Sequence, residues 1–216
     1  MNKKIHNKNI KNKLSLLING MNSFLKVFIA IILLFGFLSD TFADNQENSI
    51  NKKWVGTWST APQLVETNNN PPSPGLTNNT LRQIVHVSIG GDSLRMRFTN
   101  EFSSNQVKMN SVHIAVSTGS GSIDTATDKT IYFNGSPDVT IAAGAAVTSD
   151  PFSFSLQPLS DVAITIYYGE TSSTVSGHPG SRTTSYILKG NQVTNVNCSG
   201  AVTTDHWYNI NTIDVL

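Results

Sequence analysis

The sequence of 216 residues contains a single cysteine, Cys198, and only 13% of its residues are charged. One cysteine cannot form a disulfide within the chain, so a buried apolar core has to stabilise the fold. Six of the 15 Lys and Arg residues, but only one of the 14 Asp and Glu residues, lie within positions 1–43. The rest of the chain is therefore mildly acidic and lacks the clustered positive charge needed to bind nucleic acid or an anionic membrane surface.

Long hydrophobic runs are also missing. The longest, at 27–38, has 12 residues, whereas a membrane-spanning helix needs roughly 20. Lysines precede this run and Thr41-Phe42-Ala43 follows it, which is typical of a cleaved signal peptide. We therefore predict a leader over residues 1–43, a secreted or periplasmic protein, and no stable membrane span after cleavage; an uncleaved N-terminal anchor is the alternative. Residues 44–53 are expected to form a flexible entry and 54–216 one domain.

Helical periodicity is absent from residues 54–216, where apolar residues instead recur at every second position. Such alternation is typical of half-buried strands. It predicts an all-β fold, a single antiparallel β-sandwich of jelly-roll-like topology. In the segment 81–89, the alternation assigns Arg82, His86 and Ser88 to the outer face. The inner face of this segment is predicted to carry Leu81, Gln83, Val85, Val87 and Ile89.

The segment GGDSLRMRF, residues 90–98, contains the tetrapeptide Gly-Asp-Ser-Leu that marks the nucleophilic serine in a large family of esterases and lipases. A catalytic serine there needs a buried strand before it and a helix after it. Here the alternating strand RMRF follows, so we predict that Ser93 flanks a β-hairpin turn at Gly91-Asp92 and is not a nucleophile. The expected hairpin pairs Ile89 with Leu94, Val87 with Met96, and Val85 with Phe98.

Five segments resemble, in the same order, the β-rich N-terminal region of secreted SGNH (GDSL-type) hydrolases. They are WVGTWSTAPQ (54–63), TLRQIVHVSIGGDSLRMRFTNEF (80–102), VHIAVS (112–117), VTIAAGAAVTSDPFSFSLQPLSDVAITIYY (139–168) and GHPGSRTTSYI (177–187). The last ten residues, WYNINTIDVL, are similar to the segment that leads into the catalytic domain of that family. The resemblance covers nearly all of 54–216.

The family's catalytic blocks are not matched. Asp205 and His206 are adjacent, whereas the family motif is Asp-x-x-His. The resemblance therefore implies a noncatalytic accessory domain of an ester hydrolase, whose partner is an SGNH catalytic domain in a longer product or a relative. Its substrates would be acylated carbohydrates or lipids, and no catalytic residue can be transferred to this chain.

Six residues are candidates for binding. Trp54 and Trp58 are four positions apart, so a regular strand would place both on one face, as core residues or as a sugar-stacking platform. With Trp207 they define the alternative function, a stand-alone carbohydrate-binding module. His178 and Arg182 lie in a Gly/Pro-rich stretch that suggests a substrate or domain interface. Asn100 is a further candidate, although a turn role is favoured.

Metal and cofactor sites are not predicted. His86 and His113 lie far apart in the sequence and have no evident third ligand. The carboxylates are scattered through turn-like segments, so no pair of them suggests shared acid-base chemistry. The only enzymatic alternative is a self-sufficient esterase that uses Ser93.

Overall fold

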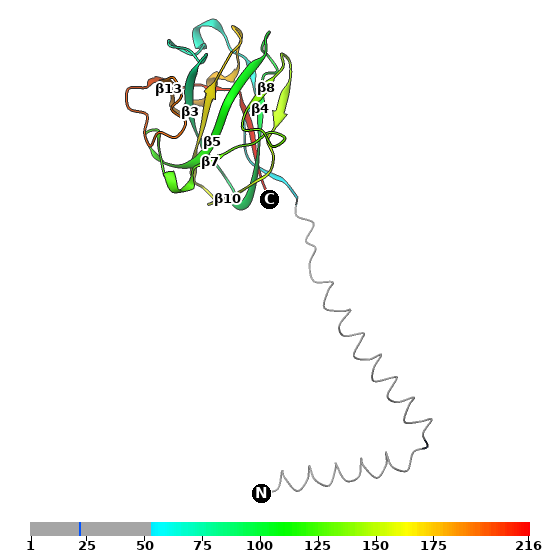
Figure 1. The fold of residues 1–216 in the computed structure, drawn as a ribbon. Coiled ribbons are helices and arrows are strands. Elements are labelled where there is room, and N and C mark those ends of the chain that lie inside the picture. The colour runs from blue at the N-terminus through cyan, green and yellow to red at the C-terminus, as the bar shows by residue number, and fades with distance from the viewer. Residues whose placement is uncertain (1–21, 23–52) are drawn as a thin grey trace. The chain divides into compact units, whose positions relative to one another are not determined.

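A computed structural model of the chain describes Asn22 and residues 53–216. Residues 53–216 form one compact unit (Figure 1). The predicted leader, apart from Asn22, and residues 44–52 of the entry segment lie outside the described residues. In the part of the chain that is described, no helix is long and apolar enough to cross a membrane.

The described strands pair only in antiparallel fashion and form three sheets, which confirms the predicted all-β sandwich. The first sheet has the order β1 (Val55–Ser59), β16 (Ile210–Val215), β4 (Gly91–Thr99) and β10 (Phe152–Leu156), with β9 (Ala146–Thr148) also beside β4. The second has the order β14 (Val202–Thr204), β13 (Ser185–Lys189), β3 (Asn79–His86), β11 (Asp161–Tyr168), β5 (Val107–Gly119) and β6 (Ser122–Ile123), with β7 (Lys129–Thr130) and β8 (Val139–Ile141) beside β5. A small third sheet joins β15 (Trp207–Tyr208), β12 (Ser176–His178) and β2 (Gln63–Leu64). Short 3-10 turns lie at η1 (Thr67–Asn69), η2 (Thr125–Thr127) and η3 (Pro179–Ser181).

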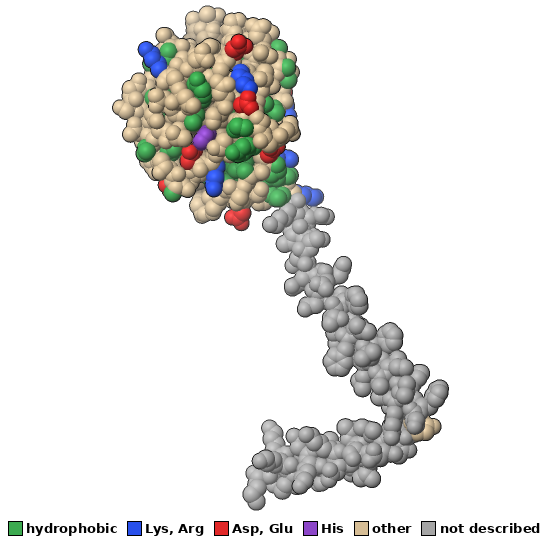
Figure 2. All heavy atoms as spheres, in the orientation of Figure 1, with side chains coloured by type: hydrophobic (Ala, Val, Ile, Leu, Met, Phe, Trp, Pro, Cys, Tyr) green, Lys and Arg blue, Asp and Glu red, His purple; other side chains and the backbone are tan. Residues whose placement is uncertain are grey.

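The core lies between the two large sheets and consists of the apolar rows that the alternation predicts. Leu81 and Val85 of β3 are buried with Leu94, Met96 and Phe98 of β4 in one cluster. Burial of each such side chain contributes about 1.5–3 kcal/mol relative to exposure. Charged side chains of both signs are scattered over the visible surface of the domain (Figure 2).

The predicted hairpin between 81–89 and 94–98 is wrong. β3 pairs with β11 and β13, whereas β4 pairs with β16, β10 and β9, so the two strands belong to different sheets. Alternation in the sequence shows which side chains of a strand face the core. The same apolar rows are expected whether two strands pair in a hairpin or face each other from the two sheets of a sandwich. The apolar rows were therefore correct and the hydrogen-bonded partners were not.

The glycines of the GGDSL segment serve close packing rather than a positive φ. Neither Gly90 nor Gly91 has positive φ. A Cβ atom on Gly91 would overlap Cγ2 of Val215, and one on Gly90 would overlap the carbonyl oxygen of Leu156. The predicted turn at Gly91-Asp92 is absent because both residues are already part of β4.

Ile89 departs from the predicted burial, and Arg82 lies on the predicted outer face but is buried there. Ile89 is 43% exposed, whereas Arg82 is completely buried. The Arg82 guanidinium donates from Nε to Thr165 Oγ1 (2.9 Å), from Nη1 to the Gly121 carbonyl (2.8 Å) and from Nη2 to the Asn195 carbonyl (2.7 Å). The outer face of β3 is thus covered by two connections, which alternation within a strand cannot reveal.

Arg82 belongs to a row of polar residues that crosses five strands. Register pairs place Tyr186 opposite Arg82, Arg82 opposite Thr165, Thr165 opposite His113, and His113 opposite Thr130. His113 is buried, and its Nδ1 lies 3.0 Å from a carboxylate oxygen of Asp128. The second sheet therefore has a polar layer on the face that points away from the main core.

Substitution of Arg82 by methionine should lower the stability of the protein. The change leaves the carbonyls of Gly121 and Asn195 without their charged donor, and we expect a loss of about 3 kcal/mol in the free energy of unfolding. The matched control is Arg97→Met, because Arg97 is exposed and forms only a surface ion pair with Glu101; its cost should stay below about 1 kcal/mol. Urea denaturation measures both, and equal costs would contradict the role assigned to Arg82.

The lone thiol should be unreactive in the folded protein. Cys198 is buried with its Sγ 3.4 Å from the Gly121 carbonyl oxygen. Burial raises the pKa of the Cys198 thiol, an effect that the nearby Arg82 opposes only in part, so little thiolate forms at neutral pH. Reaction with Ellman's reagent should be at least about tenfold slower than in urea-unfolded protein; equal rates would rule out the buried position.

Candidate functional site

Trp54 and Trp58 lie on opposite faces of the first sheet, contrary to the prediction that they share one. β1 pairs Gly56 with Asp214 and Trp58 with Ile213, so one extra residue, Thr57, forms a β-bulge. A bulge reverses the alternation of the residues that follow it. Trp58 consequently packs against the core on the side of the buried Ile213.

Trp54 is associated with charged side chains on the outer face. The Arg95 guanidinium carbon lies 4.7 Å from the centre of the Trp54 ring, and Arg95 Nε donates to Asp214 Oδ2 at 2.8 Å. This cation–π contact occupies one face of the indole ring. Trp54 is therefore not part of a platform with Trp58.

Three predicted site residues from separate strands do come together. The Trp207 ring lies 5.0 Å from Trp58 in an edge-to-face arrangement and 6.1 Å from His178 in a stacked one. Trp207 Nε1 donates to the Ile84 carbonyl at 3.1 Å. Because Trp58 and Trp207 are perpendicular and packed against the core, they offer no flat pair of rings for sugar stacking.

His178 and Arg182 flank the short turn η3. His178 Nδ1 donates to the Ala61 carbonyl at 3.0 Å, which leaves Nε2 as the ring nitrogen for another partner. Arg182 is exposed, adopts φ +52°, and makes no hydrogen bond or ion pair with another described residue. Both side chains are thus accessible for an interaction with a partner.

Asn100 is completely buried, so it cannot itself contact a ligand or a partner domain. Its Nδ2 donates to the carbonyls of Asn105 (2.8 Å), Ile141 (3.1 Å) and Ala142 (3.0 Å). Its backbone amide donates to the Ala145 carbonyl at 2.8 Å. Asn100 therefore ties the loop before β5 to the loop after β8.

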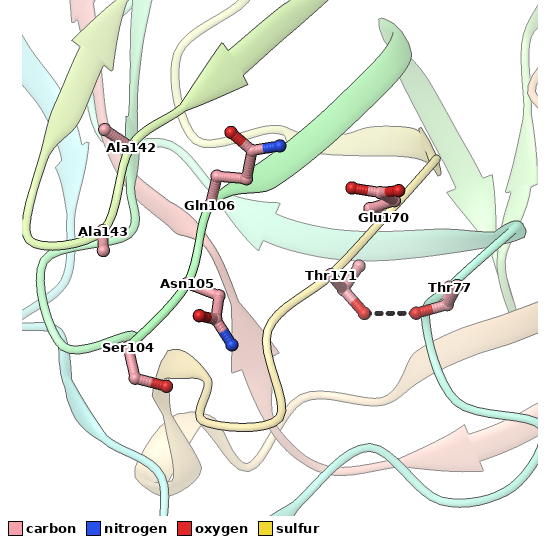
Figure 3. Close-up of a pocket in the computed structure, with 8 residues that line it drawn as sticks. All are labelled: Thr77, Ser104, Asn105, Gln106, Ala142, Ala143, Glu170 and Thr171. Atoms are coloured by element: carbon pink, nitrogen blue, oxygen red, sulfur yellow. Dashed lines mark hydrogen bonds between the residues drawn. The ribbon is translucent and has the colours of Figure 1, made fainter.

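These two loops border a hollow of about 640 Å³ that the sequence does not reveal (Figure 3). Its polar side chains come from three segments that are distant in sequence. In Figure 3, Asn105 and Gln106 lie on one side, and Glu170, Thr171 and Thr77 lie on the other. The full lining consists of Thr77, Ser104, Asn105, Gln106, Ala142, Ala143, Glu170 and Thr171.

A second hollow of about 230 Å³ shares part of its lining with the first. The two share Thr77 and Thr171, whose hydroxyl oxygens are 2.5 Å apart. Prolines 71 and 74 line it together with Asn70, whose side-chain oxygen is buried and has no hydrogen-bond partner among the described residues. We call the two hollows together the polar groove.

The remaining titratable candidates are dispersed. Ser93 is the third residue of β4, lies opposite Ser153 of β10, and accepts a hydrogen bond from the Leu216 amide through its carbonyl. His86 pairs with Asp161 at 2.7 Å on the surface. Within residues 53–216, no three His, Cys, Asp or Glu side chains are grouped so that they could hold a metal ion.

Comparison with known proteins does not assign the chain to a family. No protein-family model matches the sequence, and no curated protein matches it. Function has to be inferred from the residues and their geometry.

The role of Asn100 in holding the two loops together can be tested by substitution with alanine. The change removes the donor shared by one buried and two partly buried carbonyls, so we expect a loss of about 2 kcal/mol in the free energy of unfolding. Asn105→Ala is the control, because the exposed Asn105 side chain has no hydrogen bond within the described domain; its effect should stay within about 0.5 kcal/mol. Thermal and urea denaturation give both values, and a neutral Asn100→Ala variant would contradict the assignment.

Proposed function

We propose that residues 53–216 form a noncatalytic accessory β-sandwich of a secreted or periplasmic ester hydrolase of the SGNH (GDSL) type. The segments that carry the resemblance make up most of the sandwich. Segment 80–102 contains nearly all of β3 and all of β4, and segment 139–168 contains β8 to β11. Segments 54–63 and 177–187 contain β1, part of β12 and most of β13. The resemblance thus follows the framework of the domain rather than scattered loops.

The observation that carries the noncatalytic part of the proposal is the position of Ser93. A nucleophilic serine needs its hydroxyl within hydrogen-bond reach of a general base, about 2.6–3.2 Å. Ser93 instead lies within a paired strand, and its hydroxyl makes no hydrogen bond with a described histidine. This geometry supports a structural role for the tetrapeptide and favours ester hydrolysis by a serine outside these residues.

The surface around η3 is the part of the domain that we propose contacts the catalytic domain. His178, stacked on Trp207, donates to the Ala61 carbonyl through Nδ1, so its Nε2 remains for another partner. Arg182 is exposed nearby in sequence and has no ion-pair partner in the described region. A stacked imidazole and an unpaired guanidinium are well suited to bind polar groups of a second domain.

Ester hydrolysis tests the proposal directly. The purified 216-residue chain and its Ser93→Ala variant should hydrolyse p-nitrophenyl acetate no faster than buffer does, because Ser93 has no base beside it. In a longer product that continues into an SGNH domain, Ser93→Ala should leave kcat/KM within about twofold, whereas replacing the serine of that domain should abolish turnover. Turnover by the short chain that disappears in Ser93→Ala would refute the noncatalytic assignment.

A further inference from the structure

The walls of the polar groove are held in place before any ligand arrives. Ser104 donates through its backbone amide to Thr174 Oγ1 at 2.6 Å, and the amide of Asn105 donates to Ser172 Oγ at 3.2 Å. On the opposite wall, the Lys108 amide donates to the Glu170 carbonyl at 2.8 Å. A site whose walls are already ordered loses less conformational entropy when it binds.

The buried Asn100 fixes two of these walls relative to one another. It bonds the carbonyl of Asn105, which lines the groove, and that of Ala142, which also lines it. The buried amide nitrogen of Asn100 donates to three backbone carbonyls, whereas its side-chain oxygen is buried and has no hydrogen-bond partner among the described residues. The hydrogen bonds of Asn100 thus support, from inside the protein, the two loops that line the polar groove.

Three of the side chains that line the groove are not committed to the protein itself, whereas the hydroxyls of Thr77, Thr171 and Ser104 are hydrogen-bonded within it. Asn105, Gln106 and Glu170 form no side-chain hydrogen bond or ion pair with any described residue. Lys108, the nearest basic residue in sequence, is paired with Asp138 instead. Two amides and one carboxylate therefore converge on the hollow with all their donors and acceptors available.

The chemistry of the lining narrows the class of ligand. Glu170 is the only charged residue in the lining, so anionic ligands such as phosphates, nucleic acids and uronic-acid polymers are disfavoured. Ala142 and Ala143 are the only apolar residues of the larger hollow, which offers too little apolar surface for an acyl chain. Further apolar surface is found only in the smaller hollow, from Pro71, Pro74, Leu76 and Val175. Amides and a carboxylate next to hydroxyls match the alternating donors and acceptors of a neutral sugar chain.

The smaller hollow adds a second surface beside Thr77 and Thr171. Its lining includes the rings of Pro71 and Pro74 and Asn70, whose buried side-chain oxygen has no donor among residues 53–216. Hollows on both sides of the Thr77–Thr171 hydrogen bond suit an extended chain better than a small molecule.

We propose that the polar groove is a binding site for a neutral oligosaccharide, with Gln106, Asn105 and Glu170 as the recognising side chains. This site does not involve the aromatic residues Trp54, Trp58 and Trp207. It is also independent of the proposed association with an ester hydrolase.

Calorimetric titration of the 216-residue chain tests this inference. The probes are xylohexaose, cellohexaose and maltohexaose, with trigalacturonate as the anionic comparison and calcium chloride alone as the cation comparison, each to about 10 mM. We expect saturable binding of at least one neutral hexasaccharide and no binding of trigalacturonate. Gln106→Ala and Glu170→Gln should each weaken that binding about tenfold, as expected for loss of one or two direct hydrogen bonds.

Control variants distinguish binding in the groove from binding elsewhere on the domain. Gln157→Ala removes an exposed amide in the turn after β10 and should leave affinity within about twofold. Thermal unfolding should show that all variants remain folded. The proposal is overturned if no neutral hexasaccharide binds, if calcium binds and the saccharides do not, or if Trp207→Phe weakens binding while Gln106→Ala and Glu170→Gln do not.

Discussion

The structure depends on a positive charge buried without a carboxylate beside it. Arg82 lies in the second sheet with no ion pair to a described residue, and its donors are taken by one hydroxyl and three backbone carbonyls. Burial lowers the pKa of Arg82, but a guanidinium stays protonated in proteins, so the charge has to be stabilised by dipoles. The Gly121 turn and the 193–195 connection must therefore close over β3 together. Cys198 and the polar row toward His113 lie in the same layer and share this constraint.

Much of the fold could be predicted from alternation, because period two reports which side chains face a core. It identified the apolar rows of β3 and β4 correctly and predicted the antiparallel sandwich. It could not identify hydrogen-bonded partners, so a crossover between sheets was interpreted as a hairpin. It also missed the bulge at Thr57, since one extra residue reverses the faces without any change in composition. Arg82 was correctly assigned to the outer face, but its burial could not be predicted, because coverage of that face depends on connections far away in sequence.

For the candidate sites, too, the sequence identified individual residues but not the contacts between distant segments. The sequence singled out His178, Trp58 and Trp207, and the structure brings these three together, while Arg182 stays exposed without a partner among the described residues. Asn100 was singled out for its place at a strand end, but its function as a brace requires carbonyls from 105 and from 141–142. The polar groove left no local signal at all. Its residues are common loop residues, and only the packing of separate connections makes them converge.

The order of strands in the first sheet has a consequence for how the chain acquires its structure. β1 reaches the sheet only through β16, since its one partner there is the strand at 210–215. Val55 and Val215 are thus paired although nearly the whole domain lies between them. While a ribosome is still synthesising the segment before Ile210, β1 has no strand to pair with, and β4 can pair with β10 and β9 but not with β16. Closure of that sheet is a late event governed by long-range contacts, which are slow to form. Partly made chains accordingly present open strand edges to the cell.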